Sequence, residues 1–265
     1  MPQHHAPNRP TEPASPTTRR VALVTGGSRG IGAATALTFA QHGYDVALTY
    51  RNKTARAQEV VDSIEQAGQR GLALTCDMTH SEEISRFFQT LQQWSTRLDA
   101  LILNASGGME RDLVAADPNY AIHINRDAQL HFVDAALPWL ARGSTITFVT
   151  SHWAHLYGQM EQLPAYEPVA ESKYAGEQAL RARQDEFANR GIRLLIVTGD
   201  LIEGTITPKL LERAAPGLIT QRRTSQGALP TATEMGQQIA QATLNPALSS
   251  GALVVVGAPL DSMRS

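Results

Sequence analysis

Seven short apolar runs recur along the chain, separated by longer amphipathic stretches. The runs lie at residues 21–25, 45–50, 71–76, 100–105, 145–150, 193–199 and 252–257. Two of the amphipathic stretches close on Gly43 and Gly68, and glycine suits the end of a helix. Strands that are apolar on both faces and alternate with helices are typical of a parallel sheet covered on both sides. The pattern therefore predicts an α/β fold, a single doubly wound domain with a mostly parallel seven-stranded sheet.

The first 18 residues differ from the rest of the chain, because they hold five prolines and almost nothing large and apolar. Such a segment gains too little burial to offset the cost of ordering it. We therefore predict a disordered tail over residues 1–18 and one domain over residues 19–265. Arg19 and Arg20 precede an apolar run that stops at Thr25, which is too short for the core of a signal peptide.

Charge and cysteine content exclude several kinds of partner. The formal net charge is −2 and no basic run exceeds two residues, so neither nucleic acid nor an anionic membrane surface is expected as a partner. No stretch resembles a membrane span. The only cysteine, Cys76, cannot form an internal disulfide, and no Cys/His cluster has the spacing of a zinc site. We expect a small-molecule partner, no metal and a cytoplasmic location.

The first apolar run leads directly into "TGGSRGIG", residues 25–32, and then into a helical stretch. Gly26 permits a sharp exit from the strand, Gly30 lets the backbone approach a phosphate, and Gly32 permits close packing. The free N–H groups at the start of the helix attract an anion. The loop therefore predicts a dinucleotide site, which also includes Ser28, Arg29 and Ile31.

The glycine spacing T-G-x-x-x-G-x-G resembles that of the short-chain dehydrogenase/reductase family, over residues 20 to about 260. The resemblance implies a single Rossmann domain, a nicotinamide cofactor and hydride transfer to or from a carbonyl or alcohol carbon. In "CDMT", Asp77 matches the family's aspartate that contacts adenine, with Met78 beside it. The alternative for Asp77 is a turn residue that caps the next helix. In "NAS", Asn104 and Ala105 match the family's N-A-G motif, with Ser106 in place of glycine.

The choice between NAD and NADP depends on charge at the end of the second strand. An acidic residue there would bind the ribose 2′-hydroxyl of NAD and repel the 2′-phosphate of NADP. This chain has Tyr50 followed by Arg51, and Arg29 lies in the glycine loop. Two arginines can supply charge-assisted hydrogen bonds to a phosphate. NADP is therefore the predicted cofactor, unless both arginines are merely solvated.

The resemblance further implies a catalytic set of Asn, Ser, Tyr and Lys. Asn125 lies in a stretch predicted as one long helix over residues 119–140 and matches the asparagine that supports a proton-relay water. Ser151 follows the fifth strand and matches the serine that binds the substrate oxygen. Lys173 matches the lysine that binds the nicotinamide ribose and lowers the tyrosine's pKa. The alternatives are a turn serine and a solvated helix lysine.

The chain departs from the family at Val169, four residues before Lys173, where the family's Y-x-x-x-K motif has its tyrosine. Tyr166 lies seven residues before the lysine, which returns to nearly the same helix face after two turns. Its separation from Ser151 is also close to that of the family's serine and tyrosine. Tyr166 is therefore the predicted catalytic tyrosine. Other candidate acids in the intervening segment are His152, His155, Tyr157 and Glu161.

The segment after the sixth strand matches the family's P-G motif loosely, with Gly199 present and Thr198 in place of proline. Thr205, after Gly204, suits a loop that contacts the cofactor, and residues 208–214 suit a lid over the substrate. Asp200 and Glu203 either contact the substrate or are loop residues in solvent.

These residues predict an NADP-dependent oxidoreductase that reduces a ketone or 3-oxoacyl-like carbonyl to a secondary alcohol. The alternative is a non-redox protein of the same fold, an isomerase, a dehydratase or a cofactor-binding regulator, that has lost the catalytic tyrosine. By resemblance to the family, we expect a homodimer or homotetramer that pairs the helices carrying Asn125 and Lys173.

Overall fold

The computed structural model describes residues 19–263, so the predicted tail over residues 1–18 lies outside the described residues. The seven predicted strands form one sheet in the order β3-β2-β1-β4-β5-β6-β7, and every neighbouring pair is parallel. Their bounds are β1 Arg20–Val24, β2 Tyr44–Tyr50, β3 Gly71–Thr75, β4 Leu98–Leu103, β5 Leu140–Ser151, β6 Arg193–Gly199 and β7 Leu253–Val256. The predicted fold class is confirmed.

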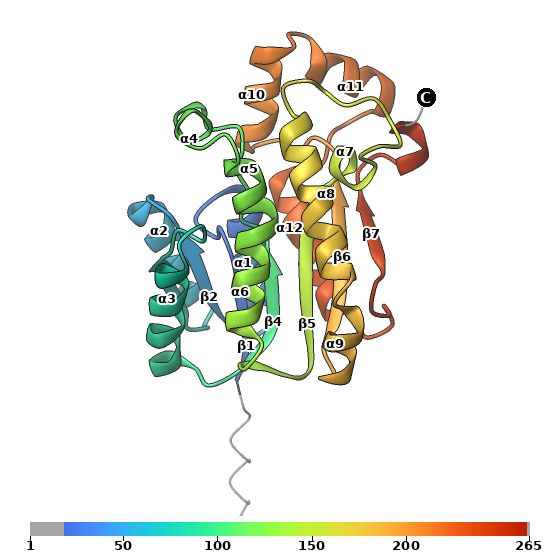
Figure 1. Ribbon diagram of the computed structural model, residues 1–265. Helices are drawn as coiled ribbons and strands as arrows, with labels where there is room; N and C mark the ends of the chain where they lie inside the picture. Colours follow the sequence, from blue (N-terminus) through green and yellow to red (C-terminus); the bar gives the residue numbers. More distant parts are fainter. Residues whose placement is uncertain (1–18, 264–265) are drawn as a thin grey trace, which may run out of the picture.

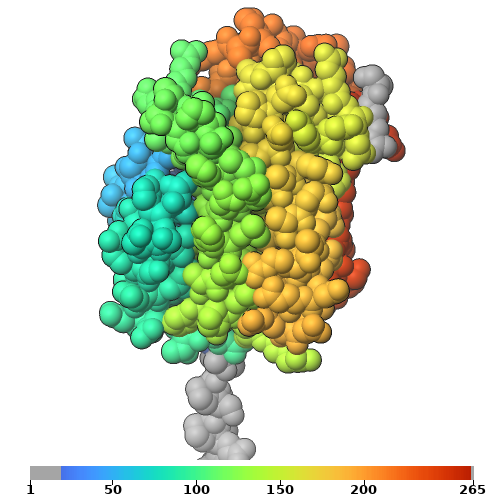
Figure 2. Space-filling model, viewed as in Figure 1, coloured from blue at the N-terminus to red at the C-terminus, as the bar shows by residue number. Residues whose placement is uncertain are grey.

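Helices cover both faces of the sheet, which explains why strands such as β2 are buried along their whole length (Figure 1). One face holds a core that includes Phe39, Ile64 and Ile239, and the other holds a core that includes Phe132 and Leu180. Figure 2 shows the second face, where the helices of this layer lie side by side. The helices of the first face are α1 Gly30–Gln41, α2 Thr54–Gln66 and α12 Ala232–Leu244, and those of the second are α3 Ser81–Trp94, α6 Ala128–Ala136, α8 Glu167–Arg181 and α9 Gln184–Asn189.

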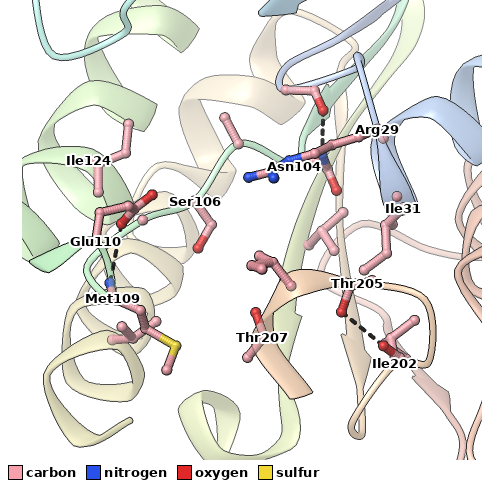
Figure 3. Close-up of a pocket in the computed structure, with 18 of the residues that line it drawn as sticks. Arg29, Ile31, Asn104, Ser106, Met109, Glu110, Ile124, Ile202, Thr205 and Thr207 are labelled. Carbon is pink, nitrogen blue, oxygen red and sulfur yellow. Dashed lines mark hydrogen bonds between the residues drawn. The ribbon is translucent and has the colours of Figure 1, made fainter. Parts of the chain in front are cut away.

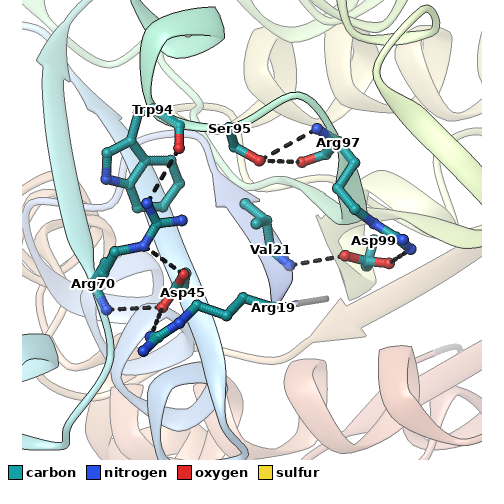
Figure 4. Close-up of polar contacts among 8 residues, drawn as sticks. All are labelled: Arg19, Val21, Asp45, Arg70, Trp94, Ser95, Arg97 and Asp99. Carbon is teal, nitrogen blue, oxygen red and sulfur yellow. Dashed lines mark hydrogen bonds and ion pairs between the residues drawn. The ribbon is translucent and has the colours of Figure 1, made fainter. Parts of the chain in front are cut away.

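A polar network joins the amino ends of β1, β2 and β4 (Figure 4). The buried carboxylate of Asp45 accepts hydrogen bonds from Arg19 at 3.1 Å and Arg70 at 2.7 Å. Asp99 accepts a 2.8 Å hydrogen bond from the backbone N–H of Val21. Burial alone would raise the pKa of Asp45, but the hydrogen bonds from Arg70 and Arg19 outweigh it and hold that pKa below its usual value. The network ties together the amino ends of these strands, at the end of the sheet opposite their carboxyl ends.

The long helix predicted over residues 119–140 is interrupted. It consists of α5 (Tyr120–Ile122), a π-helical turn η1 (His123–Asp127) and α6, which ends at Ala136. The last predicted residue, Leu140, instead begins β5, where it pairs with Leu98 ahead of a register shift. π-helical turns are rare, and hydrophobic periodicity does not distinguish them from α-helix.

Two helices lie above the carboxyl ends of the strands, α10 (Ile206–Ala214) and α11 (Leu218–Gln226) (Figure 1). The short helices α4 (Arg111–Ala116) and α7 (His152–His155) and the 3₁₀ turn η2 (Leu260–Met263) lie at the same end. None of the helices in residues 19–263 combines the length and apolar composition needed to cross a membrane.

Candidate functional site

A pocket of about 820 Å³ lies at the carboxyl ends of the strands. Ligands of doubly wound folds bind at this edge, where the chain leaves β1 for one side of the sheet and continues from β4 on the other. In Figure 3 the glycine loop contributes Arg29 and Ile31, the segment after β4 contributes Ser106 and Met109, and the segment after β6 contributes Thr205. These three loops, which lie far apart in the sequence, thus meet at the pocket.

The glycine loop has the geometry that its spacing predicts. Gly26 has a φ of +66°, which side chains rarely adopt. A Cβ on Gly32 would lie 2.4 Å from the carbonyl oxygen of Gly26, so the loop folds back against the start of α1. The Asn104 amide donates to the carbonyl oxygen of Thr25 at 3.0 Å and thereby ties the loop to β4. The N–H groups in the first turn of α1 are left at the pocket for an anion.

Most residues predicted to bind the cofactor line this pocket. They are Gly26, Ser28, Arg29, Gly30, Ile31, Gly32, Tyr50, Arg51, Asp77, Met78, Asn104, Ala105, Lys173 and Thr205. Gly199 lies outside the lining, because it ends β6 and packs against Ile202 and Met235. Asp77 lies at the pocket but also accepts two hydrogen bonds from Thr79, at 3.0 and 2.7 Å. It therefore has the contacts of a turn residue as well as the placement of a ligand.

The end of β2 gives the pocket a basic wall. Lys53 and Arg56 line it together with Arg29 and Arg51, and motif reasoning did not single out the first two. Lys53 lies two residues after Arg51, and Arg56 lies in the first turn of α2, so their position just after the second strand was the available signal. Arg51 is not free, because its Nη1 donates a 2.7 Å hydrogen bond to the hydroxyl of Tyr120 on α5. The structure thus provides a cluster of cations, one of which bridges the pocket to α5.

Ser151 ends β5 and caps the short helix α7. Its Oγ accepts a 3.2 Å hydrogen bond from the N–H of Ala154 and a 3.1 Å hydrogen bond from the hydroxyl of Tyr166. Tyr166 lies at the N-cap of α8, only 6% exposed, with its ring edge-on to Trp153 at a centroid separation of 6.4 Å. The helix entrance therefore carries the phenol to the serine, although the two residues are fifteen apart in the chain.

Lys173 and Val169 lie on the face of α8 that lines the pocket. Within residues 19–263, the Lys173 ammonium has no hydrogen-bond or ion-pair partner, and burial lowers its pKa to about 8. Burial raises the pKa of Tyr166, and the hydrogen bond with Ser151 opposes that rise. The lysine therefore does not contribute to the raised pKa of the phenol, nor the phenol to the lowered pKa of the lysine. Val169 packs beside Gly108, whose Cβ would lie 3.0 Å from its Cγ2.

Asn125 lies behind the pocket rather than in its lining. Its amide donates to the carbonyl oxygen of Gly107 at 2.9 Å and to the Ser172 hydroxyl at 3.0 Å. The buried side chain thus joins the π-helical turn to the segment after β4 and to α8. Its contacts position the pocket walls.

The other candidate acids do not reach the pocket. The His152 ring is fully buried between the Thr198 hydroxyl at 3.0 Å and the carbonyl oxygen of Ala258 at 2.9 Å, and burial lowers its pKa to about 4. The His155 ring bonds to the buried carboxylate of Glu177. Neither histidine lines the pocket, and nor do Tyr157 and Glu161.

Two acidic residues after β6 hold the helix α11 in place. Asp200 pairs with Arg222 at 2.6 Å in a largely buried contact, and Glu203 pairs with Arg223 at 2.6 Å. Both arginines belong to α11. The sequence predicted that Asp200 and Glu203 contact the substrate or are loop residues in solvent. Asp200 also lines the pocket, so its contact with a substrate stays a prediction.

The chain is similar in sequence to a known protein family and to several proteins of known activity. A family model described as short chain dehydrogenase matches residues 20–214. The chain is 30% identical over 202 residues to 1-cyclohexenylcarbonyl-CoA reductase of Streptomyces collinus, covering 74% of this chain and 69% of that protein. It is 30% identical over 207 residues to a hydroxynaphthalene reductase of Aspergillus fumigatus, covering 76% of this chain and 73% of that protein.

Solved structures show the same fold. A short chain dehydrogenase from Burkholderia cenocepacia in complex with NADP is similar with a TM-score of 0.79 and 26% identity, over 92% of this chain and 98% of that one. A dehydrogenase/reductase from Sinorhizobium meliloti is similar with a TM-score of 0.76 and 28% identity, over 89% of this chain and 93% of that one.

Proposed function

Because the chain belongs to the short-chain dehydrogenase/reductase family, we propose that it is an NADP-dependent reductase that converts a ketone or 3-oxoacyl-like carbonyl to a secondary alcohol. The observation that carries the proposal is the 3.1 Å hydrogen bond between Tyr166 and Ser151, at the wall of a pocket that also contains the glycine loop. Through this hydrogen bond the site has a phenol hydroxyl at the serine, although Val169 occupies the position where the family motif has its tyrosine.

The pocket fits a dinucleotide that carries an extra phosphate. Its glycine loop leaves room for a pyrophosphate beside the start of α1, and Arg29, Lys53 and Arg56 supply positive charge near the end of β2. A nicotinamide cofactor would supply the hydride. Lys173 would bind its ribose, since this ammonium faces the pocket without a protein partner.

The protein's own residues would orient the substrate and supply the proton. Ser151 would bind the carbonyl oxygen, and Tyr166 would serve as the source of the proton that the reduced oxygen takes up. Asn125 would act as a positioning residue through Gly107 and Ser172. The predicted lid, residues 208–214 of α10, lines the pocket through residues 208–211 and would limit the entry of water.

An apolar wall supports a ring-bearing carbonyl as substrate. Met109, Trp153, Val169 and Leu211 line the pocket, and all pack in the same cluster as Tyr166. Two relatives are named as reductases of a cyclohexenylcarbonyl-CoA and of a hydroxynaphthalene, which are also ring-bearing compounds.

The experiment is to mix the purified protein with NADPH and one carbonyl at a time, β-tetralone, ethyl acetoacetate or acetoacetyl-CoA, and to follow the loss of NADPH absorbance. We expect at least one carbonyl to be reduced and the corresponding alcohol to be recovered. Binding of NADPH without consumption by any of the three would favour the non-redox alternative, for which Val169 is the supporting observation.

We further propose that the protein works in the cytoplasm as a homodimer or homotetramer, paired through the helices that carry Asn125 and Lys173. The lone Cys76 supports a reducing compartment, because the sequence has no second cysteine with which it could form an internal disulfide. Sedimentation of the purified protein tests the assembly, and a monomeric mass would contradict it.

A further inference from the structure

We infer that Ser151, rather than Tyr166, is the group that hands the proton to the substrate oxygen, and that Tyr166 resupplies the serine. The inference rests on the proposed reductase function and concerns the order of the two hydroxyls. It makes Ser151 the direct acid of the site and Tyr166, which also lines the pocket, the residue that returns a proton to the serine.

The hydrogen bonds of Ser151 leave one group for a ligand. A serine hydroxyl has one hydrogen to donate and two lone pairs that accept. Both lone pairs are engaged, one by the N–H of Ala154 at 3.2 Å and the other by the hydroxyl of Tyr166 at 3.1 Å. Because Ser151 lines the pocket, the group it can offer there is its own O–H. The site therefore suits an acceptor such as a carbonyl oxygen.

The surroundings of Tyr166 leave the Ser151 oxygen as the acceptor for its hydroxyl hydrogen. The phenol is 6% exposed and packs in an apolar cluster with Trp153, Val169 and Leu211. Its O–H is donated to Ser151, and Lys173 makes no hydrogen bond to it. A tyrosine that reached the substrate directly would have to give up the Ser151 contact.

The step balances as two linked proton transfers. A bound nicotinamide cofactor would supply the hydride to the carbonyl carbon, and the electron pair of the broken C–O π bond would move to the oxygen. That oxygen forms a bond to the Ser151 proton, while the Ser151 oxygen forms a bond to the Tyr166 proton. The phenolate that remains takes a proton from water after the product leaves. A phenol is a far stronger acid than an aliphatic alcohol, so the transfer from Tyr166 runs downhill.

A double-mutant cycle tests the order of the hydroxyls. With the best carbonyl among β-tetralone, ethyl acetoacetate and acetoacetyl-CoA, we expect Ser151→Ala and Tyr166→Phe each to lower kcat by roughly 100-fold or more. The double variant should be no slower than Ser151→Ala alone, because without the serine the tyrosine has no route to the substrate. Ser85→Ala, on the far helix α3, is the matched serine control and should leave kcat unchanged. Penalties that multiply in the double variant would overturn the inference.

Two further measurements separate the relay from a merely structural role. The solvent isotope effect should vary non-linearly with the deuterium fraction in the wild type, since two protons move together, and a linear dependence would count against the relay. In the cofactor-free protein, ¹³C-tyrosine NMR should show the Tyr166 phenol titrating at higher pH in Ser151→Ala, because the hydrogen bond with Ser151 lowers that pKa. An unmoved titration would show that the two hydroxyls do not interact.

Failure of the inference and failure of the proposed function give different results. Carbonyl turnover with multiplying penalties would leave the reductase intact and remove the relay. NADPH binding with no carbonyl turnover would remove both.

Discussion

The hydroxyl of Tyr166 lies 3.1 Å from that of Ser151, although the backbone of Tyr166 lies two helical turns before Lys173 instead of one. The distance arises because the tyrosine occupies the N-cap of α8 and its ring turns inward against Trp153. A site can thus keep an acidic hydroxyl at the serine while Val169 occupies the motif position.

The first prediction concerns this hydroxyl. Tyr166→Phe removes one oxygen with little change in volume, so NADPH affinity should be retained while kcat falls by roughly 100-fold or more. Tyr157→Phe is the matched control, since Tyr157 does not line the pocket, and its kcat should equal that of the wild type. Steady-state kinetics and NADPH fluorescence titration measure the two quantities. Full turnover in Tyr166→Phe would mean that the proton has another source.

A second prediction concerns Val169, which occupies the position of the family's motif tyrosine. In a Tyr166→Phe background, Val169→Tyr places a hydroxyl one turn before Lys173, at a side chain that already lines the pocket. We expect this variant to regain turnover at least tenfold over Tyr166→Phe alone, within the range that a positioned acid contributes. Val169→Phe in the same background has the ring without the hydroxyl and should stay slow. Equal rates for the two would assign any gain to packing.

The third prediction concerns cofactor choice. NADPH should bind at least ~10-fold more tightly than NADH, because the end of β2 is basic and has no acid where NAD enzymes place one. Arg29→Ala and Arg56→Ala should each weaken NADPH more than NADH, and Arg51→Asp should reverse or abolish the preference. Arg86→Ala, an exposed arginine on α3, should change neither affinity. Titration of both cofactors decides the matter, and equal affinities in the wild type would defeat the charge argument.

The fourth prediction follows from the buried ammonium of Lys173, whose pKa falls from 10.5 to about 8. Between these values the unfolded chain keeps a proton that the folded chain has lost, so the free energy of unfolding rises with pH. Below pH 8 both states are charged and the folded state bears the whole cost of burial, about 3 kcal/mol for a shift of this size. Lys173→Met should therefore be more stable than the wild type at pH 7, and the gap should close toward pH 10.

Urea unfolding of both proteins from pH 7 to pH 10 measures this gap. Tyrosines and Cys76 titrate in both proteins, so the difference between them isolates the lysine. Lys209→Met, at an exposed lysine on α10, should show no pH-dependent gap. A constant difference between Lys173→Met and the wild type would show that the ammonium is not desolvated.

The fifth prediction concerns the contact between α8 and the π-helical turn. A Cβ on Gly176 would lie 2.2 Å from the carbonyl oxygen of Asn125, so Gly176→Ala must push the two elements apart. We expect a loss of about 1–3 kcal/mol in the free energy of unfolding, the usual cost of overpacking, together with weaker NADPH binding as Lys173 shifts. Gln178→Ala, exposed on the same helix, should change neither. Wild-type stability in Gly176→Ala would show that the contact is loose.

Local patterns predicted the fold, and most of the residues that they assigned to the cofactor line the pocket. Gly26 and Gly32 could be predicted from the glycine spacing after the first strand, although the atoms that crowd them include Asn104 and Ala105, which lie far away in the chain. The seven strands were equally readable, since burial on both faces leaves continuous apolar runs. The family resemblance added Asn125, Ser151 and Lys173, whose catalytic roles stay predictions.

Contacts between segments that lie far apart in the chain could not be predicted from the sequence. Hydrophobic periodicity does not indicate that Arg51 pairs with Tyr120, 69 residues away, or that Asp200 pairs with Arg222 on α11. The π-helical turn at Asn125 was missed for a related reason, because it depends on how α8 packs against that turn. The candidate acids His152 and His155 lie outside the pocket lining, and sequence proximity to Ser151 could not show this, because it does not specify which way a ring points.

The position of Tyr166 at a junction also bears on how such a site diverges. The lysine belongs to the body of a helix, whereas the phenol belongs to the last residue of the connecting segment before it. An insertion or deletion in that segment would relocate the acid while the cofactor-binding face of the helix stayed in place. Under the proposed mechanism, the position of the proton source would therefore depend on the connecting segment, and the nucleotide site would not.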